Sequence, residues 1–270
     1  MVETTVRRTK GGRMHLFHRD LGGEGHPSLL ILHGLLGSSR NWQTVGRLLS
    51  RDCHVCALDL RNHGESPWRD EQSYDLMMDD VLAWMDHQAI ERATLMGHSM
   101  GGKVAMRLAC RHPNRVGGLV VVDIAPRAYP STHLLEFKAM NSLRTSEVTS
   151  RADAESKMGK LVKDWALRKF LLTNLERSDD GRFSWKINVF ALEESMGKLE
   201  EEPLDPEDRY RDPVLFLLGG KSAYFRKEDE ATARRHFPKA DFLRIEESGH
   251  NPHIEAKDRF VDEVRRWLKR

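Results

Sequence analysis

Residues 97–101 form the segment whose residue types and spacing most directly suggest chemistry. They read Gly-His-Ser-Met-Gly, so one serine stands between two glycines in a Gly-x-Ser-x-Gly pattern. This pattern is typical of a nucleophile elbow, a sharp strand-to-helix turn that exposes a serine hydroxyl. Glycine is needed on both sides because the backbone folds back so closely that a Cβ would strike the neighbouring strand or helix. We therefore interpret Ser99 as a nucleophile.

A serine hydroxyl is a weak nucleophile at neutral pH, so Ser99 needs a general base and a third group that orients the base. His250 is the candidate base, because it follows a glycine directly after the last strand that we expect, at residues 240–245. His236 and His253 lack this position and are interpreted as surface histidines. His250 and His253 also have His-x-x-His spacing, but no third metal ligand accompanies them at suitable spacing, and we expect no metal site.

Strands and helices that alternate along the chain must position these side chains. The apolar run 93–96 precedes Ser99, and the helical pattern 102–109 follows it. Eight strands are expected, at residues 2–8, 14–20, 28–32, 55–59, 93–96, 118–123, 213–220 and 240–245. The first two strands are joined by a turn at 10–12, which indicates an antiparallel pair. The strands and helices that follow alternate, which predicts a mostly parallel α/β sheet covered on both faces. In such sheets the active site lies beyond the carboxyl ends of the strands.

Residues 127–205 interrupt this alternation. Strands disappear there, and helical, strongly charged sequence appears at 134–143, 152–169 and 188–201, with a turn at 178–181. We predict a helical cap at 127–205, inserted into a core domain made of residues 1–126 and 206–270. The larger apolar residues of the cap are expected mainly in core stripes, although a few could line an acyl pocket; they include Leu134, Phe137, Met140, Leu161, Trp165, Phe170, Phe183, Trp185 and Phe190.

The composition excludes several classes of function. The 270 residues carry 43 lysines and arginines against 41 acidic residues, and a net charge of +2 does not favour nucleic acid or a membrane surface as a partner. No segment resembles a signal peptide or approaches the roughly 20 apolar residues that span a bilayer. These features predict a soluble, cytoplasmic protein, either a monomer or a small homo-oligomer.

The three cysteines, Cys53, Cys56 and Cys110, are too few for a disulfide framework. Cys53 and Cys56 have Cys-x-x-Cys spacing, which could indicate redox or metal chemistry. However, the pair falls where a strand approaches the buried sheet, and alternation would point the two thiols to opposite faces. We interpret both as packing residues.

Five motifs together resemble the α/β-hydrolase superfamily over nearly the whole chain. They are residues 33–38 (His-Gly-Leu-Leu-Gly-Ser), 59–66 (Asp-Leu-Arg-Asn-His-Gly-Glu-Ser), 97–103 (Gly-His-Ser-Met-Gly-Gly-Lys), 120–126 (Val-Val-Val-Asp-Ile-Ala-Pro) and 249–250 (Gly-His). Within the superfamily the chain most resembles the small serine esterases that include bacterial acyl-CoA and short-chain ester hydrolases and their mitochondrial relatives. The resemblance implies the α/β-hydrolase fold, with the eight strands expected above.

The resemblance also bears on the third member of the triad. Most of the superfamily carries the acid in the loop after the strand equivalent to residues 213–220, but here that loop has no carboxylate. Glu228 and Asp229 are the nearest, yet they begin an expected helix, where acidic residues are common because of the helix dipole. Asp123 ends a neighbouring strand from which it could reach His250, and the resembled subgroup shares this arrangement. The resemblance therefore implies Asp123, with Asp229 and Glu228 as alternatives.

Acyl transfer requires hydrogen-bond donors for the tetrahedral oxyanion, and in this fold they are backbone N–H groups. The resemblance implies Met100, the residue after the nucleophile, and Leu35, in the loop after the strand at 28–32. Four polar residues of the neighbouring loops are expected to brace these loops rather than to transfer protons: His33, Arg61, His63 and His98.

These observations predict a serine hydrolase that cleaves carboxylic esters or thioesters of short to medium acyl chains through an acyl-enzyme, without a cofactor. Its partner is then a small-molecule ester or thioester. Serine at the elbow argues against the dehalogenase and epoxide hydrolase branches of the fold, which use aspartate there. The alternatives are a carbon–carbon bond hydrolase, a perhydrolase or a hydrolase-like small-molecule receptor. A charged cap without an obvious exposed apolar face argues against the receptor.

Overall fold

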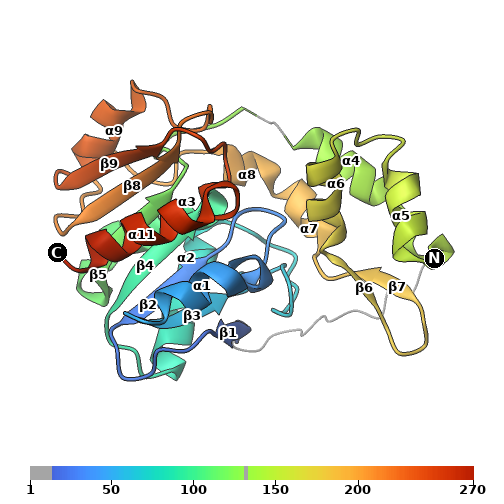
Figure 1. Cartoon of the computed structure of the whole chain (residues 1–270), viewed down its shortest axis with the longest axis horizontal. Helices are drawn as coiled ribbons and strands as arrows, with labels where there is room; N and C mark the ends of the chain where they lie inside the picture. Colours follow the sequence, from blue (N-terminus) through green and yellow to red (C-terminus); the bar gives the residue numbers. More distant parts are fainter. Residues whose placement is uncertain (1–13, 131–132) are drawn as a thin grey trace.

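The computed structural model describes residues 14–130 and 133–270 (Figure 1). The first expected strand, at residues 2–8, and the turn at 10–12 lie outside the described residues. The other seven expected strands form one sheet in the order β1-β3-β2-β4-β5-β8-β9. Their bounds are β1 (His18–Asp20), β2 (Ser28–Leu32), β3 (His54–Leu58), β4 (Ala93–His98), β5 (Val116–Val122), β8 (Val214–Gly219) and β9 (Ala240–Ile245).

The sheet is parallel except at its first edge, where β1 pairs antiparallel with β3. The central strands are apolar along their whole length because alternate side chains enter two different cores. In β2, for example, Leu30 and Leu32 belong to one buried cluster, and Leu29 and Ile31 belong to the other. This double burial explains why the sequence shows continuous apolar runs instead of strict alternation.

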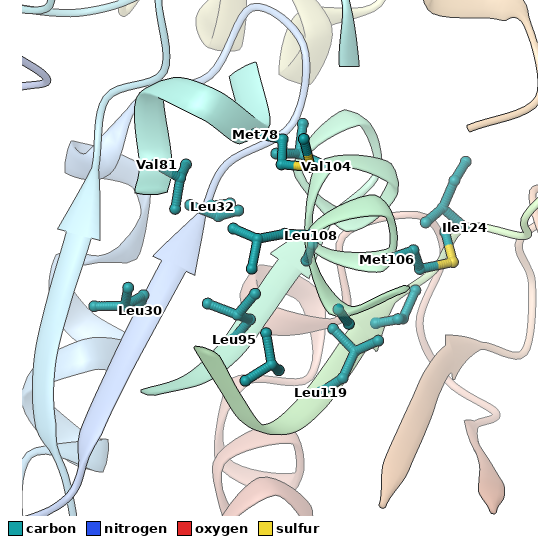
Figure 2. Close-up of a cluster of buried hydrophobic side chains, with 14 of the residues drawn as sticks. Leu30, Leu32, Met78, Val81, Leu95, Val104, Met106, Leu108, Leu119 and Ile124 are labelled. Carbon is teal, nitrogen blue, oxygen red and sulfur yellow. The ribbon is translucent and has the colours of Figure 1, made fainter. Parts of the chain in front are cut away.

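Helices cover both faces of the sheet. On one face, α1 (Gln43–Leu49) and α11 (Lys257–Leu268) supply Val45, Leu49, Phe260 and Val264 to the core. The other face is covered by α2 (Tyr74–His87), α3 (Met100–Arg111) and α9 (Asp229–His236). Figure 2 shows this second core, where leucines of the strands meet side chains of α2 and α3 such as Val81.

Several short helices connect these elements. They are the 3-10 helices η1 (Ser39–Trp42), η2 (Pro113–Arg115) and η3 (Thr145–Glu147), together with α10 (Pro252–Glu255). Within the described ranges, no helix combines the length and the apolar character needed to cross a membrane.

Residues 133–200 lie to one side of the sheet (Figure 1). Their elements are α4 (Leu134–Ser142), α5 (Arg151–Met158), α6 (Trp165–Leu172), β6 (Leu175–Arg177), β7 (Phe183–Trp185), α7 (Val189–Glu194) and α8 (Met196–Glu200). An apolar cluster built almost entirely from these elements, including Phe137, Met158 and Leu192, fills their interior. Leu36 of the core joins that cluster and links the two regions.

The expectation that this region contains no strands is wrong. β6 and β7 form a small antiparallel hairpin around the turn at 178–181, where Gly181 has a φ of 85°. Each strand has three residues, which is too short for a recognisable alternation of polar and apolar positions. The helix expected at 152–169 is also interrupted, because Asp164 caps a new helix through a hydrogen bond from the Leu167 N–H.

The expected burial of the apolar residues in this region is correct for some of them and wrong for others. Phe137, Met140 and Phe183 are buried, whereas Leu134, Trp165 and Phe190 are exposed. Phe190, at 73% exposure, is the most open of these. The expectation that this region lacks an exposed apolar face is therefore wrong, and it no longer argues against a receptor.

Candidate active site

Ser99 stands at the turn between β4 and α3, as the Gly-x-Ser-x-Gly pattern predicts. Its φ of 51° lies in the left-handed region, which a non-glycine residue rarely adopts. A Cβ at Gly97 would lie 2.2 Å from the Gly101 carbonyl oxygen, and one at Gly101 would lie 2.3 Å from the Leu32 carbonyl oxygen. The two glycines thus allow the close backbone approach that holds Ser99 in this conformation.

Asp123 and His250 meet at the carboxyl end of the sheet. The Nδ1–H of His250 donates a hydrogen bond of 2.7 Å to Oδ2 of Asp123. Asp123 is fully buried directly after β5, with a φ of 50°. Its Oδ1 accepts a 2.8 Å hydrogen bond from the Gly219 N–H, and its Oδ2 also accepts one from the Ser222 hydroxyl. These donors hold the buried carboxylate toward the imidazole.

The two alternative acids lie elsewhere. Asp229 accepts a hydrogen bond from the backbone N–H of Arg226 and pairs with Arg127 at 3.1 Å. Glu228 is exposed. Neither contacts His250, so Asp123 is the only one of the three candidates that the structure brings to the imidazole.

His98 connects the nucleophile turn to the His250 loop. The Nε2–H of His98, the residue before Ser99, donates a 2.8 Å hydrogen bond to the His250 carbonyl oxygen. The two imidazole rings are 4.7 Å apart. Among the described residues, no hydrogen bond joins the Ser99 hydroxyl to His250, and such bonds are often long or misaligned in the absence of substrate.

The interpretation of His236 and His253 as surface histidines is wrong. His236 is buried, and its Nδ1–H donates to the Asp208 carbonyl oxygen at 2.8 Å. His253 is also buried, stacked on Trp42 with ring centroids 4.1 Å apart, and lies 4.9 Å from the His98 ring. Burial lowers the pKa of His253 well below its ordinary value, so its ring is neutral.

Two backbone N–H groups lie open beside Ser99. Neither Leu35 nor Met100 donates its N–H to a protein acceptor in the described part of the chain. Gly34 brings the first of these loops against the nucleophile, because a Cβ at Gly34 would lie 3.3 Å from the Cβ of Ser99. Leu35, Ser99 and Met100 line the same pocket.

Two buried histidines brace the loop that carries Leu35. Nε2 of His33 accepts a 3.0 Å hydrogen bond from the Leu60 N–H, and Nε2 of His63 accepts one of 3.3 Å from the Leu36 N–H. Burial lowers the pKa of His33 to about 4 and that of His63 to about 3, so both rings are neutral acceptors at physiological pH.

A buried ion pair fixes the second loop, at residues 59–66. Arg61 forms a bidentate pair with Asp80 of α2, through Nε at 2.6 Å and Nη2 at 2.8 Å. The sequence-based expectation that Arg61 acts in loop rigidity agrees with these contacts. Burial raises the pKa of the Asp80 carboxyl, and the guanidinium opposes that effect.

The pocket beside Ser99 holds about 440 Å³ of empty space, including the part open to solvent. Besides apolar residues, its lining contains six polar side chains that the sequence reasoning did not assign to the site: Tyr74, Lys103, Tyr129, His133, Glu200 and Tyr224. Tyr224 stacks on the His250 ring with centroids 3.8 Å apart. The only signal for Tyr224 in the sequence was its position in the loop after β8, where most of the superfamily carries the acid.

Lys103 lies one helical turn after Ser99 and is 2% exposed. Its Nζ donates a 2.8 Å hydrogen bond to the Glu201 carbonyl oxygen and lies 4.8 Å from the centre of the Tyr129 ring. Burial lowers the pKa of Lys103 to about 7. The amine therefore ties α3 to the segment that follows α8.

Comparisons with known proteins agree with this architecture. Residues 27–257 match the family described as the alpha/beta hydrolase fold. The chain is 36% identical over 250 residues to the mouse (Mus musculus) sn-1-specific diacylglycerol lipase ABHD11, covering 90% of this chain and 81% of the relative. It is 32% identical over 241 residues to the Escherichia coli (strain K12) esterase YbfF, covering 89% and 92% of the two chains. A solved marine microorganism esterase superposes with a TM-score of 0.90 at 35% identity, covering 93% of this chain and 98% of the other.

Proposed function

The chain belongs to the α/β-hydrolase family and is a carboxylic ester hydrolase, and from that premise we propose that it cleaves short- to medium-chain esters or thioesters through Ser99, His250 and Asp123. The observation that carries the proposal is the 2.7 Å hydrogen bond from His250 Nδ1 to the buried Asp123 carboxylate. Both residues lie on loops that flank the Ser99 turn. That bond leaves Nε2 of His250 free to accept a proton from the nucleophile.

The reaction proceeds by two acyl transfers. Ser99 Oγ attacks the carbonyl carbon while His250 Nε2 takes the hydroxyl proton, and the same proton then passes to the departing alkoxide or thiolate. The acyl group stays on Ser99 until a water molecule, deprotonated by His250, attacks its carbonyl carbon; the carboxylic acid then leaves as His250 returns the proton to Ser99 Oγ. Asp123 holds the imidazole in the required tautomer and stabilises the imidazolium that forms in each step.

The unpaired N–H groups of Leu35 and Met100 stabilise the oxyanion of each tetrahedral intermediate. Removing one such donor costs about 3 kcal/mol in other enzymes, because preorganised donors need no rearrangement when charge develops. The bracing of the Leu35 loop by His33 and His63 supports this role, since both imidazoles bond to backbone N–H groups and leave Leu35 free.

The size of the pocket supports short to medium acyl chains. The cavity volume beside Ser99 is only about 50 Å³, and the larger empty space around it is partly open to solvent, so little room is enclosed for a long acyl chain. The chain is similar to a protein named as a diacylglycerol lipase and to proteins named as esterases, so lipid esters and simple esters both belong in a substrate screen. A thioester substrate, a cytoplasmic location and a monomeric or small homo-oligomeric state remain part of the proposal.

We further propose that residues 127–205 act as a cap that selects the substrate. The separate apolar cluster of this region supports its treatment as a unit. His133, Met196 and Leu199 of this region line the pocket together with Ser99 and Met100 of the core. A cap that forms one wall of the pocket can limit chain length without contacting the triad.

The test is hydrolysis of p-nitrophenyl acetate, butyrate and octanoate, and of a butyryl thioester, by the wild type and three variants. Ser99→Ala removes the nucleophile and Asp123→Asn removes the orienting charge. Asp229→Asn is the matched control, because it alters the buried carboxylate that does not contact His250. We expect Asp123→Asn to lower kcat about 10⁴-fold, the loss seen for the equivalent change in a serine protease.

Ser99→Ala should lose turnover at least as completely, and Asp229→Asn should retain it. Circular dichroism establishes that each variant is folded. If Asp229→Asn lost activity while Asp123→Asn kept it, the proposed acid would be wrong. Turnover in folded Ser99→Ala would overturn the acyl-enzyme route.

A further inference from the structure

A group of three potential metal ligands lies at the first edge of the sheet, on β1 and β3. The ligand atoms of Asp20, His54 and Cys56 all lie within 4.8 Å of one another. None of these residues lines the pocket beside Ser99. We propose that Asp20, His54 and Cys56 form a binding site for a thiophilic divalent cation, with Zn²⁺ as the best match.

The strand register brings the three side chains to one face of the sheet. Asp20 is the antiparallel partner of Cys56, so their side chains lie side by side. His54 and Cys56 are two residues apart in β3 and therefore also share a face. This placement depends on backbone pairing, which gives the three donors a defined arrangement.

The distances approach those of a tetrahedral site. Nε2 of His54 lies 3.0 Å from Oδ2 of Asp20 and 4.0 Å from Sγ of Cys56. Zinc bonds of about 2.0 Å to nitrogen and oxygen and 2.3 Å to sulfur place tetrahedral ligands about 3.3 to 3.6 Å apart. The Asp20 oxygen and the Cys56 sulfur lie within 4.8 Å of each other, so movements of about 1 Å would bring the three ligand atoms to coordination distance.

The chemistry of the donors suits Zn²⁺. Thiolate, imidazole and carboxylate are its usual ligands, and the thiolate and carboxylate together balance its two positive charges. On binding, Cys56 releases its thiol proton to solvent, and the His54 proton moves from Nε2 to Nδ1 so that Nε2 can coordinate. The Asp20 side chain is 45% exposed, which leaves room for water as the fourth ligand.

Neighbouring side chains define the limits of the site. His18 lies on the same strand as Asp20, but its Nδ1 accepts a hydrogen bond from the Trp84 Nε1–H, which leaves the ring proton on Nε2. His18 is therefore a neighbour and not a ligand. Cys53 belongs to the buried cluster on the opposite face of the sheet from Cys56, so the Cys-x-x-Cys pair does not form the site.

The experiment is a titration of the full chain, freed of metal by a chelator and dialysis, with Cd²⁺. Cd²⁺ reports directly on thiolate coordination through an ultraviolet charge-transfer band. Cys56→Ala removes the proposed sulfur ligand, and Cys53→Ala is the matched control, since both thiols are almost fully buried in the same segment. His54→Gln removes the nitrogen ligand.

We expect the wild type and Cys53→Ala to develop the band and saturate at one Cd²⁺ per chain, with Zn²⁺ competing for the site. Cys56→Ala should show no band, and His54→Gln should bind at least about tenfold more weakly. Hydrolysis of p-nitrophenyl butyrate and circular dichroism should be unchanged in Cys56→Ala, which separates the metal site from folding and from the proposed triad. The proposal is overturned if the band is absent from the wild type, persists in Cys56→Ala or fails to saturate at one equivalent.

Discussion

At the scale of single residues, the hydrogen bonds to the buried Asp123 carboxylate hold the candidate site together. Its carboxylate has no exposure and accepts hydrogen bonds from a backbone N–H, a serine and a histidine. Motif and chain order were enough to select Ser99 and His250 as candidates, whereas the family resemblance was needed to choose Asp123 over Asp229 and Glu228. The contribution of Ser222 depends on the path of the β8 loop, which no local pattern in the sequence specifies.

We predict that Ser222→Ala lowers kcat about tenfold and leaves KM nearly unchanged. The variant removes one hydrogen bond to a buried charge, and such bonds contribute roughly 1.5 to 3 kcal/mol. Because Ser222 acts on Asp123 and not on the substrate, the loss should fall on the chemical step. Steady-state kinetics with p-nitrophenyl butyrate measures both constants.

Lys221→Ala in the same loop provides the control, because the Lys221 side chain is exposed. Equal losses in Ser222→Ala and Lys221→Ala would mean that loop disturbance, and not the lost hydrogen bond, reduces activity. An increase in KM at constant kcat would instead assign Ser222 to substrate binding.

His253 shows why some residues were misinterpreted at this scale. The next two residues, Ile254 and Glu255, are exposed, yet the ring of His253 stacks on Trp42, more than two hundred residues earlier in the chain. Burial that depends on such a distant contact leaves no periodic signal near His253. The same reason applies to His236, whose hydrogen-bond partner is the Asp208 backbone.

At the scale of elements, strands buried on both faces were predictable, and the two short strands of the region 133–200 were not. β2 and β5 are long apolar runs because each contributes side chains to two cores. β6 and β7 are recognisable only through their pairing with each other. Helices were predicted where apolar periodicity is strong, as in α2 and α11. The predicted helix ends differ from the observed ends where a capping residue such as Asp164 begins a new helix.

We predict that alanine lowers the stability of the fold at Gly97 and raises it at Gly197. Gly97→Ala would place a Cβ 2.2 Å from the Gly101 carbonyl oxygen, between backbone segments that cannot separate without moving Ser99. We expect a loss of about 3 kcal/mol in the free energy of unfolding, together with loss of activity. Gly197→Ala in α8 meets no atom within 4 Å and should stabilise the helix by up to about 1 kcal/mol.

Urea unfolding of the two variants and the wild type measures these differences. Gly197→Ala also controls for the general effect of an added methyl group. If Gly97→Ala unfolded at the same urea concentration as the wild type, the close approach at the elbow would not constrain the fold in solution.

At the scale of the whole molecule, the sequence predicted a mostly parallel sheet with helices on both faces, and the structure and the family match confirm that fold. The shape of the pocket was not predictable, because it is formed by α3, α8 and the loops after β2, β5 and β8 together. Lys103 demonstrates the difficulty. It belongs to the family-like segment 97–103, but its burial results from packing against the segment that follows α8.

Buried neutral histidines also connect the active-site loops to the stability of the whole protein. Burial lowers the pKa of His33 to about 4, and those of His63 and His98 to about 3, from an ordinary value of 6.5. Between pH 6.5 and about 4 the unfolded chain therefore takes up protons at these positions while the folded chain does not. Stability must fall as the pH falls through this window, because protons bind preferentially to the unfolded state.

We predict that the free energy of unfolding falls between pH 6.5 and 4.5 by as much as about 1.4 kcal/mol per pH unit for each of these histidines. Urea unfolding at half-unit intervals of pH measures the slope.

His63→Asn removes one titrating ring and should reduce the slope by about one proton, even if it also lowers stability at every pH. His26→Asn, which alters an exposed ring, should leave the slope unchanged. Parallel curves for His63→Asn and the wild type would show that His63 does not remain neutral in the folded protein, and that the loop carrying Leu35 opens to water on acidification.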